Sequence, residues 1–563
     1  MFIRASQSNG HKYLRLVEGY RDQNGRTRHR QIAQLGRADQ PATYDKIQSL
    51  ANSLKQHTGA EGLDPASIHF DPALSLGPSW LLTELWHELG FEQQLRQAFR
   101  SAYREFDLEK VIRLLVFNRL CDPSSKLGVM RWLEQVYLPG IDTQKIYYEQ
   151  LLRAMDALVE QSEAVEETSA RLLRPLLDQE LNVVFYDITS VRIHGETELG
   201  NDLRQYGKSK DIAGVARQFA LGVVQTAEGL PIAHEVFEGN VAETHTLAPM
   251  VRRLLSRCKL ERIVVVADRG MLSLDNVDTL EALAEQEGLA VDYILAVPGR
   301  RYTEFEEILA EVHPQLVEAA KASNAESVTQ TSWQGRRLVV AHNQQRAQEQ
   351  TRVRRRKIER IDQIGQALAE RLDKQDAGCP GRGRRSTDRS AHRRFHQTVL
   401  RHNMSSIVKA DLGDEQFSYH IDEQAWSAAE RMDGKLLLVT SLNDYQAQTI
   451  VDRYRSLADI ERGFRALKST LQIAPVHHRL PDRIRAHALI CFLALILYRL
   501  LRMRLKANKS EYSVERALEA LESVQWHRVK INGESHTGVS VSNLQRKLFK
   551  DMEVKPPKQA TTA

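Results

Sequence analysis

Two runs of alternating apolar and polar residues lie within the first 40 residues, on either side of the dipeptide Asn24-Gly25. They read KYLRLVEGYR and RTRHRQIAQLG. A period of two is typical of half-buried strands, and Asn-Gly is a preferred dipeptide of two-residue hairpin turns. The pattern therefore predicts an N-terminal β-hairpin.

Helical periodicity follows between residues 79 and 177, as in SWLLTELWHELGFEQQLRQAF and DLEKVIRLLVFNRL. This stretch predicts a helical domain. The longest apolar run of the chain, ALICFLALIL, extends from Ala488 to Leu497. It is far shorter than the roughly 20 residues that span a bilayer. We therefore expect a buried core helix there and no association with a membrane.

The pattern changes near residue 180, where short apolar runs typical of buried strands begin. Strands are predicted at LNVVFYDITSV, VARQFALGVVQT, PIAHEVFEG, ERIVVVADRGM and VDYILAV, with helices from Thr246 to Ser256 and from Leu274 to Gln286. The resulting order, βββαβαβ, is the start of an RNase H-like fold with a mixed sheet.

Residues 301–430 interrupt this pattern with elements of their own, including a strand around SWQGRRLVVAH and a basic helical stretch from Thr351 to Lys374. A segment of this length is an inserted subdomain and not a loop. The core resumes with the strand KLLLVTSL and a long helix from about Ala447 to Leu471. From Gln525 the pattern is weak, and the last ten residues are expected to be disordered.

The sequence thus predicts a mixed α/β protein whose RNase H-like catalytic core is interrupted by an inserted subdomain. The expected regions are an N-terminal β-hairpin region and candidate DNA contact (1–60), a helical domain (61–178), the first part of the core (179–300), the insertion with its basic helix (301–430), the second part of the core (431–510) and a C-terminal candidate dimerisation region (511–563).

The positive charge is concentrated in one segment. Between residues 352 and 401 there are 15 Lys or Arg and 6 Asp or Glu, a net of +9, whereas the whole chain carries +5. Such a local field suits a polyanion. The candidates for phosphate contact are Arg354, Arg355, Arg356 and Lys357, and the alternative is a solvated face. The hairpin cations Arg26, Arg28 and Arg30 are a weaker case.

The four cysteines, Cys121, Cys258, Cys379 and Cys491, form no CxxC pair. They indicate reduced thiols in a cytosolic protein. The N-terminus MFIRASQSNGHKY lacks the apolar core of a signal peptide.

Two acids follow predicted strands directly: Asp187 after VVFY and Asp268 after IVVVA. If these strands are neighbours, the two carboxylates converge at one edge of the sheet. A dinucleotide-binding acid is a rival interpretation, but no GxGxxG precedes either residue. Capping of the following turn is the other alternative.

A third acid lies in the helical segment YRSLADIERGFRALKSTL, where Tyr454, Glu461 and Lys468 are spaced by seven residues. Two helical turns place them on one stripe. Leu457 and Phe464 lie beside that stripe and are expected to pack it onto the sheet. An amphipathic helix with solvated ends is the alternative.

Three carboxylates suit phosphodiester cleavage and strand transfer, which are in-line displacements at phosphorus. Two Mg²⁺ ions activate the attacking oxygen and stabilise the leaving one, and Mg²⁺ prefers hard oxygen ligands. We expect Asp187 to bridge the metals and Asp268 and Glu461 to flank it. Water or a DNA 3′-hydroxyl is then the nucleophile.

At this point the chain resembles the DDE transposases of the insertion-sequence-four superfamily, a group of bacterial insertion-sequence enzymes with the signature Tyr-x2-Arg-x3-Glu-x6-Lys. The residues that carry the resemblance are YDITS at 186–190, YGKSKD at 206–211, EGLPI at 228–232, FEGN at 237–240, ADRGM at 267–271 and IERGFRALKSTLQIAPVHHR with RIRAHALICFLAL near the end, together with MFIR and QIAQLG at the start.

The resemblance implies DNA contacts by Tyr454 and Lys468. The signature arginine is replaced by Leu457, for which Arg465, Arg453 or Arg455 are candidate substitutes. Some members cleave through a hairpin with a base flipped onto an aromatic side chain. Here Trp333 and Trp426 are the candidates, with a core role as the alternative for each.

The resemblance further implies Mg²⁺ as cofactor, with Mn²⁺ as the expected substitute, and double-stranded DNA as partner. That DNA comprises the terminal inverted repeats and the target. A homodimer in the synaptic complex and a place in the bacterial cytoplasm at the nucleoid are also expected. Two alternatives remain: a catalytically inactive, transposase-derived DNA-binding protein, and an RNase H-like nuclease without strand transfer.

Overall fold

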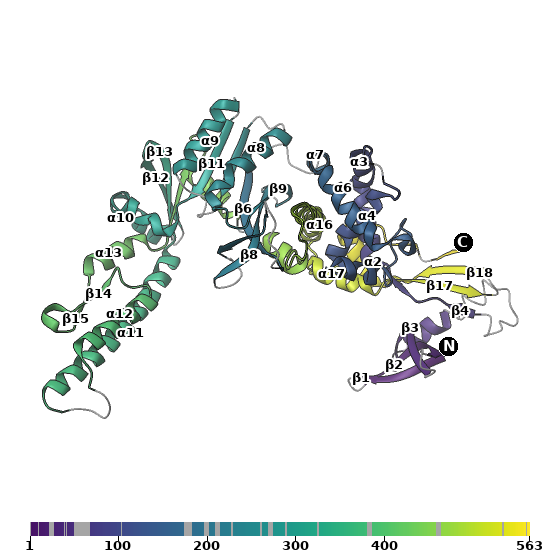
Figure 1. The fold of residues 1–563 in the computed structure, drawn as a ribbon, viewed down its shortest axis with the longest axis horizontal. Coiled ribbons are helices and arrows are strands. Elements are labelled where there is room, and N and C mark those ends of the chain that lie inside the picture. Colours follow the sequence, from purple (N-terminus) through teal and green to yellow (C-terminus); the bar gives the residue numbers. More distant parts are fainter. Residues whose placement is uncertain are drawn as a thin grey trace.

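The structure is a computed structural model (Figure 1). It describes the whole chain apart from residues 1, 9–10, 22–26, 39, 41, 50–67, 103, 174–182, 196–201, 209–213, 227–228, 259–261, 268–273, 288–289, 324–325, 380–384, 458–462, 532–533, 559 and 563.

A three-stranded antiparallel sheet lies at the N-terminus, formed by β1 (Phe2–Ser8), β2 (His11–Arg21) and β3 (Thr27–Arg37) in that order. Strands β2 and β3 are the predicted hairpin pair. The sequence pattern did not identify β1, which pairs along its whole length with β2. The Asn24-Gly25 turn and Arg26 lie outside the described residues.

The large sheet at the centre of the protein has the strand order β12-β13-β16-β11-β10-β6-β8-β7, and β9 also pairs with β8. The parallel strands β6, β10 and β11 lie in its middle, and the strands on either side pair antiparallel. The strand bounds are β6 Val183–Arg192, β7 Gln205–Lys208, β8 Val215–Thr226, β9 Pro231–Glu238, β10 Arg262–Ala267, β11 Ala290–Ala296, β12 Ser327–Trp333, β13 Arg336–His342 and β16 Lys435–Thr440. The protein is thus mixed α/β, as predicted.

Strands β12 and β13 correct the predicted boundary of the insertion. The stretch SWQGRRLVVAH is not one strand but part of a hairpin that turns at Gln334 and Gly335, both with positive φ (49° and 77°). Positive φ at both central residues is the requirement of a type I′ turn. Because β13 pairs with β16, this hairpin belongs to the central sheet and not to an insertion that begins at residue 301.

The inserted part is an arm, residues 344–432, that projects from the sheet (Figure 1). It consists of α11 (Gln344–Asp376), α12 (Asp388–Arg401), β14 (Val408–Asp411), β15 (Ser418–Ile421) and α13 (Glu423–Met432). Side chains such as Ile361 and Phe395 form a small core separate from the main one. The arm can therefore hold its own shape.

Helices pack on the sheet and beside it. Near the sheet lie α8 (Leu247–Cys258), α9 (Leu274–Glu287), α10 (Glu306–Ser323), α14 (Ala447–Arg455) and the π-helix η8 (Ala466–Thr470). The predicted helical domain contains α2 (Gly77–Glu88), α3 (Phe91–Ala98), α4 (Leu108–Cys121), α5 (Lys126–Leu133), α6 (Tyr148–Glu160) and α7 (Ser162–Leu173).

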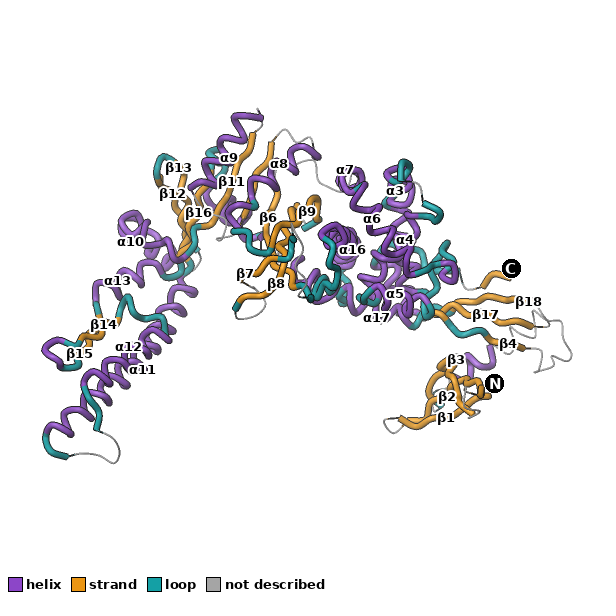
Figure 2. The backbone as a smooth tube through the Cα atoms, viewed as in Figure 1, coloured by secondary structure: helices purple, strands orange, loops and turns teal. Residues whose placement is uncertain are grey.

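Helix α16 (Pro481–Ala507) is the predicted core helix. Its length and composition would suit a membrane span, but 94% of its apolar window is buried inside the protein. It packs against α4, α6 and β9, and so joins the helical domain to the sheet (Figure 2). The assignment of residues 431–510 to the second part of the core stays a prediction.

The C-terminal region is more ordered than its weak pattern predicts. After α17 (Val514–Glu522), strands β17 (Gln525–Ile531) and β18 (Glu534–Val539) pair with β4 (Ile68–Phe70), β5 (Leu74–Ser75) and β19 (Ala560–Thr562). Helix α18 (Asn543–Asp551) buries Leu548 and Phe549. The sequence predicts disorder for the last ten residues. This expectation is wrong for those of them that the structure describes, because β19 pairs antiparallel with β18.

Candidate active site

Asp187 lies in the interior of β6 and not at its end, which corrects the prediction of a strand that ends in an acid. Its side chain is half-buried, and Val223 of β8 is its partner across the strand pair. The carboxylate oxygen Oδ1 accepts a hydrogen bond of 2.7 Å from the backbone N–H of Ile188. This bond fixes the orientation of the carboxylate relative to its own strand.

On its other side, β6 pairs in parallel with β10. The last described residue of β10, Ala267, is the partner of Tyr186, which directly precedes Asp187. The residue after Ala267 in the sequence is Asp268. The two strands are therefore neighbours, which is the condition under which the two carboxylates are expected to converge.

Asp268 itself and Glu461 lie outside the described residues. Among the residues that are described, no group of three His, Cys, Asp or Glu side chains could hold a metal ion. Since two of the three predicted ligands are not among them, the metal site stays a prediction.

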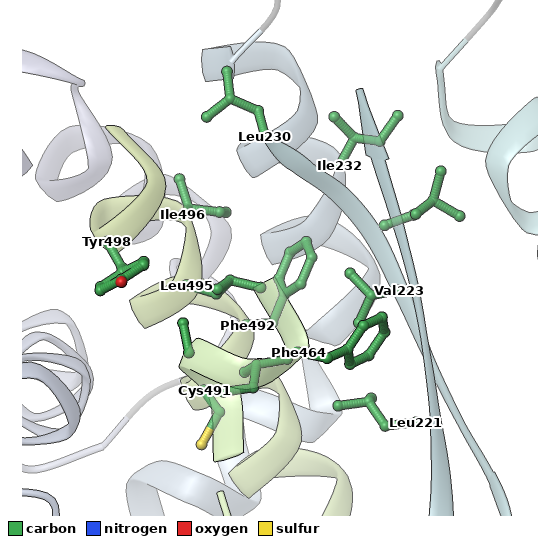
Figure 3. Close-up of a cluster of buried hydrophobic side chains, with 14 of the residues drawn as sticks. Leu221, Val223, Leu230, Ile232, Phe464, Cys491, Phe492, Leu495, Ile496 and Tyr498 are labelled. Carbon is green, nitrogen blue, oxygen red and sulfur yellow. The ribbon is translucent and has the colours of Figure 1, made fainter. Parts of the chain in front are cut away.

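The segment around Glu461 is anchored to the protein core on both sides. Leu457 is 5% exposed and Phe464 is 6% exposed. Phe464 lies among Leu221 and Val223 of β8 and Phe492 of α16 (Figure 3). The prediction that both side chains pack this segment against the interior agrees with their burial.

Gly463 permits a close approach at the same place. A Cβ atom there would lie 3.0 Å from Nη2 of Arg499 and 3.0 Å from the amide group of Gln225. Arg499 is buried on α16 and donates a hydrogen bond of 3.0 Å to Oε1 of Gln225 on β8. The backbone at Gly463, two residues after Glu461 in the sequence, therefore packs directly against the hydrogen-bonded pair of Arg499 and Gln225.

The α-helix predicted from Ala447 to Leu471 is observed in part: residues 447–455 and 463–465 are α-helical, and residues 458–462 lie outside the described part of the chain. Helix α14 ends at Arg455, and residues 466–470 form the π-helix η8, whose end is closed by a hydrogen bond of 2.9 Å from Leu471 N–H to the carbonyl of Ala466. A π turn is wider than an α turn and is frequent at functional sites. Lys468 lies within it, half-buried, so the seven-residue stripe does not extend to Lys468 in α-helical geometry.

Leu457, which stands where the resemblance leads us to expect an arginine, is buried in the core. Of the three candidate substitutes, the guanidinium of Arg453 lies over the Tyr445 ring at 4.4 Å and Arg455 pairs with Glu326. Arg465 is exposed, and its guanidinium has no ion-pair partner in the described part of the chain. A DNA contact by Arg465 stays a prediction.

In the basic run on α11, Arg354 has a structural role that the charge pattern did not reveal. Its guanidinium forms a two-fold ion pair with the carboxylate of Asp433, at the end of the arm nearest the sheet, and Thr351 donates to the same carboxylate at 2.7 Å. The side chains of Arg354 and Asp433 are 15% and 5% exposed. Its assignment as a DNA contact is not supported, whereas Arg355 and Arg356 are exposed, Lys357 is half-buried, and their assignments stay predictions.

We expect Arg354→Met to loosen the arm, because it leaves the buried carboxylate of Asp433 without its cation. Removing one partner of a buried ion pair costs about 3 kcal/mol. Limited proteolysis and denaturant unfolding would measure the loss, with the exposed Arg356→Met as the matched control. Equal stability of the two variants would contradict a structural role for Arg354.

A second row of cations in the arm was missed by the sequence analysis. Arg389, Arg393, Arg394 and Arg401 are exposed on α12, on the side opposite the buried Ala391, Phe395 and Val399. None of the four forms an ion pair within the described residues, in contrast to Arg354. The signal was present in the helical spacing of these arginines within DRSAHRRFHQTVLR.

The two tryptophans predicted as candidates for base stacking differ in exposure. Trp333 is 7% exposed, and its ring lies 4.9 Å from that of Phe305, so the core role is the one observed. Trp426 is half-buried and lines an open pocket with Ile358 and Ile421, and the guanidinium of Arg354 lies 5.8 Å from its ring. A stacking role stays a prediction for Trp426 alone.

Comparison with known proteins gives two family matches. Residues 178–497 match the family described as "Transposase DDE domain", and residues 3–66 match "IS1634 family transposase, N-terminal domain". No curated protein matches the sequence significantly.

Among solved structures, the "Mos1 transposase paired-end complex with left transposon end" matches at 13% identity over 33% of this chain and 77% of that chain. Its TM-score of 0.14 is too low to support an argument. The match over residues 178–497, by contrast, spans more than half of the chain and includes Asp187 and its strand neighbours. The chain therefore belongs to the transposase DDE domain family.

Proposed function

We propose that the protein is an active insertion-sequence transposase of the insertion-sequence-four superfamily. It cuts at the terminal inverted repeats of its element and joins the 3′-hydroxyls to target DNA. The observation that carries this proposal is the position of Asp187, half-buried on β6, where the parallel neighbour β10 leads directly into Asp268 in the sequence. Synapsis of two ends requires at least a dimer on DNA, and the bacterial cytoplasm is the place of action.

The strand order supports an RNase H-like catalytic core. Strands β9, β8, β6, β10 and β11 lie side by side, with β8 antiparallel to β6, and with β10 and β11 parallel to it. This is the order that the predicted βββαβαβ arrangement requires when its first strand is central. The strands β16, β13 and β12 extend the same sheet beyond β11.

The donor set fits a hard divalent cation. Asp187, Asp268 and Glu461 would hold two Mg²⁺ ions through carboxylate oxygens, which Mg²⁺ prefers, and Mn²⁺ would substitute. Bound there, the ions supply activation of the attacking oxygen and stabilisation of the leaving one. The hydrogen bond from Ile188 N–H holds one oxygen of Asp187, and the β6–β10 pairing keeps its strand rigid.

The chain's cations would position the DNA strand for in-line attack. Lys468 and Arg465 flank the buried Ala466 and Leu467, so their backbones are held by the core, while Arg465 is exposed and Lys468 is half-buried. Tyr454 on α14 packs partly against the same core. We assign these three side chains to phosphate contacts near the cleaved bond.

The test is a cleavage and strand-transfer assay with the full-length protein, Mg²⁺ and duplexes that carry the ends of the element. Cutting at the repeat and covalent joining to target DNA support the proposal. Cutting without joining would favour an RNase H-like nuclease, and end-binding without either would favour an inactive DNA-binding protein. Either of these last two outcomes would reject the proposal of an active transposase.

We expect Lys468→Ala to slow cleavage by roughly 10- to 1000-fold, because it removes about 1.4 to 4 kcal/mol of strand positioning or charge stabilisation. Single-turnover cleavage rates at saturating DNA measure this effect. Lys547→Ala, an exposed lysine on α18, is the control. Full activity of Lys468→Ala would mean that this residue only supports the π-helix.

A further inference from the structure

Three basic side chains are buried where the helical domain meets the segment that follows η8. Lys126, the first residue of α5, is 6% exposed, Arg119 on α4 is 4% exposed and His487 on α16 is 6% exposed. The ammonium of Lys126 has neither a hydrogen-bond acceptor nor a carboxylate partner among the described residues. The Nδ1 atom of His487 also lacks a partner.

The neighbours of Lys126 are held in place by backbone carbonyls. Arg119 donates to the carbonyls of Ser124 and, at 3.5 Å, of Gln472, and His487 Nε2 lies 3.0 Å from the carbonyl of Ile473. The ring of His478 is 5.9 Å from that of His487. Arg119 and His487 thereby have hydrogen-bond acceptors, whereas the ammonium of Lys126 has none within the described part of the chain.

The pKa values of Lys126 and His478 are lowered by burial and by the positive charges around them. Burial, and then the charge of Arg119, lower the pKa of Lys126 to about 7. Burial, and then the charge of Lys126, lower the pKa of His478 to about 4. The thiol of Cys491 supplies no compensation, since burial raises its pKa to about 11. A buried cation of this kind is stabilised when an anion accompanies it.

The N-terminus of α5 offers further donors at the same place. Ser125 caps the helix by accepting the N–H of Gly128 at 3.1 Å, while the N–H groups of Lys126 and Leu127 belong to the first turn, which a helix leaves unpaired. Helix N-termini with such donors bind phosphate groups. Leu127 is 62% exposed, so this turn is open to the surface.

The cluster is also close to the strand that carries Asp187. Beyond β6, the N–H of His194 donates at 2.9 Å to the carbonyl of Val476. The ring of His194 stacks on that of the exposed His477, with centroids 5.2 Å apart. Three segments therefore lie close together: the end of β6, the segment after η8 and the start of α5.

We propose that Lys126 and the first turn of α5 form a phosphate-binding site that holds a backbone phosphate of the transposon-end DNA. The proposal rests on the proposed function for the identity of the ligand. The shared chemistry is a phosphate group, which a DNA strand or free inorganic phosphate could supply. Holding the strand at this point fixes it relative to β6.

The experiment compares wild type with Lys126→Met, which keeps the buried stem and removes the charge, and with Lys145→Met, an 81% exposed lysine of the same domain, as control. We expect Lys126→Met to bind end DNA about ten-fold more weakly. The slope of log affinity against log salt should fall by about 0.9. Lys126→Arg should restore both, and Lys145→Met should change neither.

A second measurement separates the two sources of phosphate. Thermal unfolding is followed in inorganic phosphate and in chloride at equal ionic strength. In one outcome phosphate stabilises wild type but not Lys126→Met, while the two proteins have the same slope of log DNA affinity against log salt. That result would assign the site to free phosphate and overturn the DNA assignment. An unchanged slope without any phosphate effect overturns the site altogether.

A surface variant keeps the test decisive if Lys126→Met does not fold. Leu127→Asp places a negative charge at the exposed mouth, and Leu127→Asn is its neutral control. We expect the aspartate alone to weaken DNA binding, about ten-fold, and equal binding by both variants would reject the site. Failure of the proposed function is recognised separately, because wild type would then neither cut nor join DNA while the phosphate measurement still reports on the site.

Discussion

Asp187→Asn is expected to abolish DNA cleavage, with a loss of at least about 10³-fold, and to leave binding of the transposon end largely intact. The substitution keeps the size of the side chain and an oxygen that can accept the N–H of Ile188. It removes the negative charge that a divalent cation requires, and a metal ion supplies several kcal/mol of transition-state stabilisation. Cleavage assays and gel shifts with the same DNA measure the two effects separately.

The matched control is Asp292→Asn on β11 of the same sheet. Asp292 accepts a hydrogen bond of 2.8 Å from Ser441, which an asparagine oxygen can also accept. This variant should cut normally. We expect Asp268→Asn and Glu461→Gln to behave like Asp187→Asn. Substantial Mg²⁺-dependent cutting by any one of the three would reject the assignment of the carboxylates.

Neutralising the four arginines of α12 is expected to have the second-largest effect, this time on binding. The variant carries glutamine at Arg389, Arg393, Arg394 and Arg401. Each lost phosphate contact lowers the slope of log affinity against log salt by about 0.9, so the slope should fall by up to about 3.6. Affinity should fall by roughly 10²- to 10³-fold for all DNA sequences alike, because phosphates carry no sequence information.

The comparison variant changes Arg355, Arg356 and Lys357 on α11 and leaves the structural Arg354 in place. Lys357 is half-buried, so this set should lower the salt slope less than the α12 set. Fluorescence anisotropy over a range of salt concentrations gives both slopes. An unchanged slope in the α12 variant would show that its arginines form only a solvated face.

The prediction for Leu457 changes once its burial is known. The family signature suggested Leu457→Arg as a way to restore a missing DNA contact. Because Leu457 is 5% exposed within the main core, an arginine there would place a charge in an apolar environment. Burying an unpaired charge is costly, so the variant would lose packing and gain no contact.

The local pattern of the sequence was sufficient for the elements that carry the candidate site. Runs such as VVFY and IVVVA are apolar because the middle strands of the sheet are buried on both faces, and that pattern identified β6 and β10 before their pairing was known. The run ALICFLALIL likewise identified α16 as a core helix. Whether a segment forms a buried strand or a buried helix depends mainly on its local run of apolar residues, which the sequence shows directly.

Tertiary structure decided which elements meet, and therefore what each polar residue does. The charge run on α11 does not reveal that Arg354 faces Asp433, 79 residues later in the chain. Nor does the spacing of Tyr454, Glu461 and Lys468 reveal the π-helix that contains Lys468. The hairpin of β12 and β13 looks like part of an insertion until its pairing with β16 is seen. In each case the deciding contact joins segments distant in sequence, so a local pattern cannot encode it.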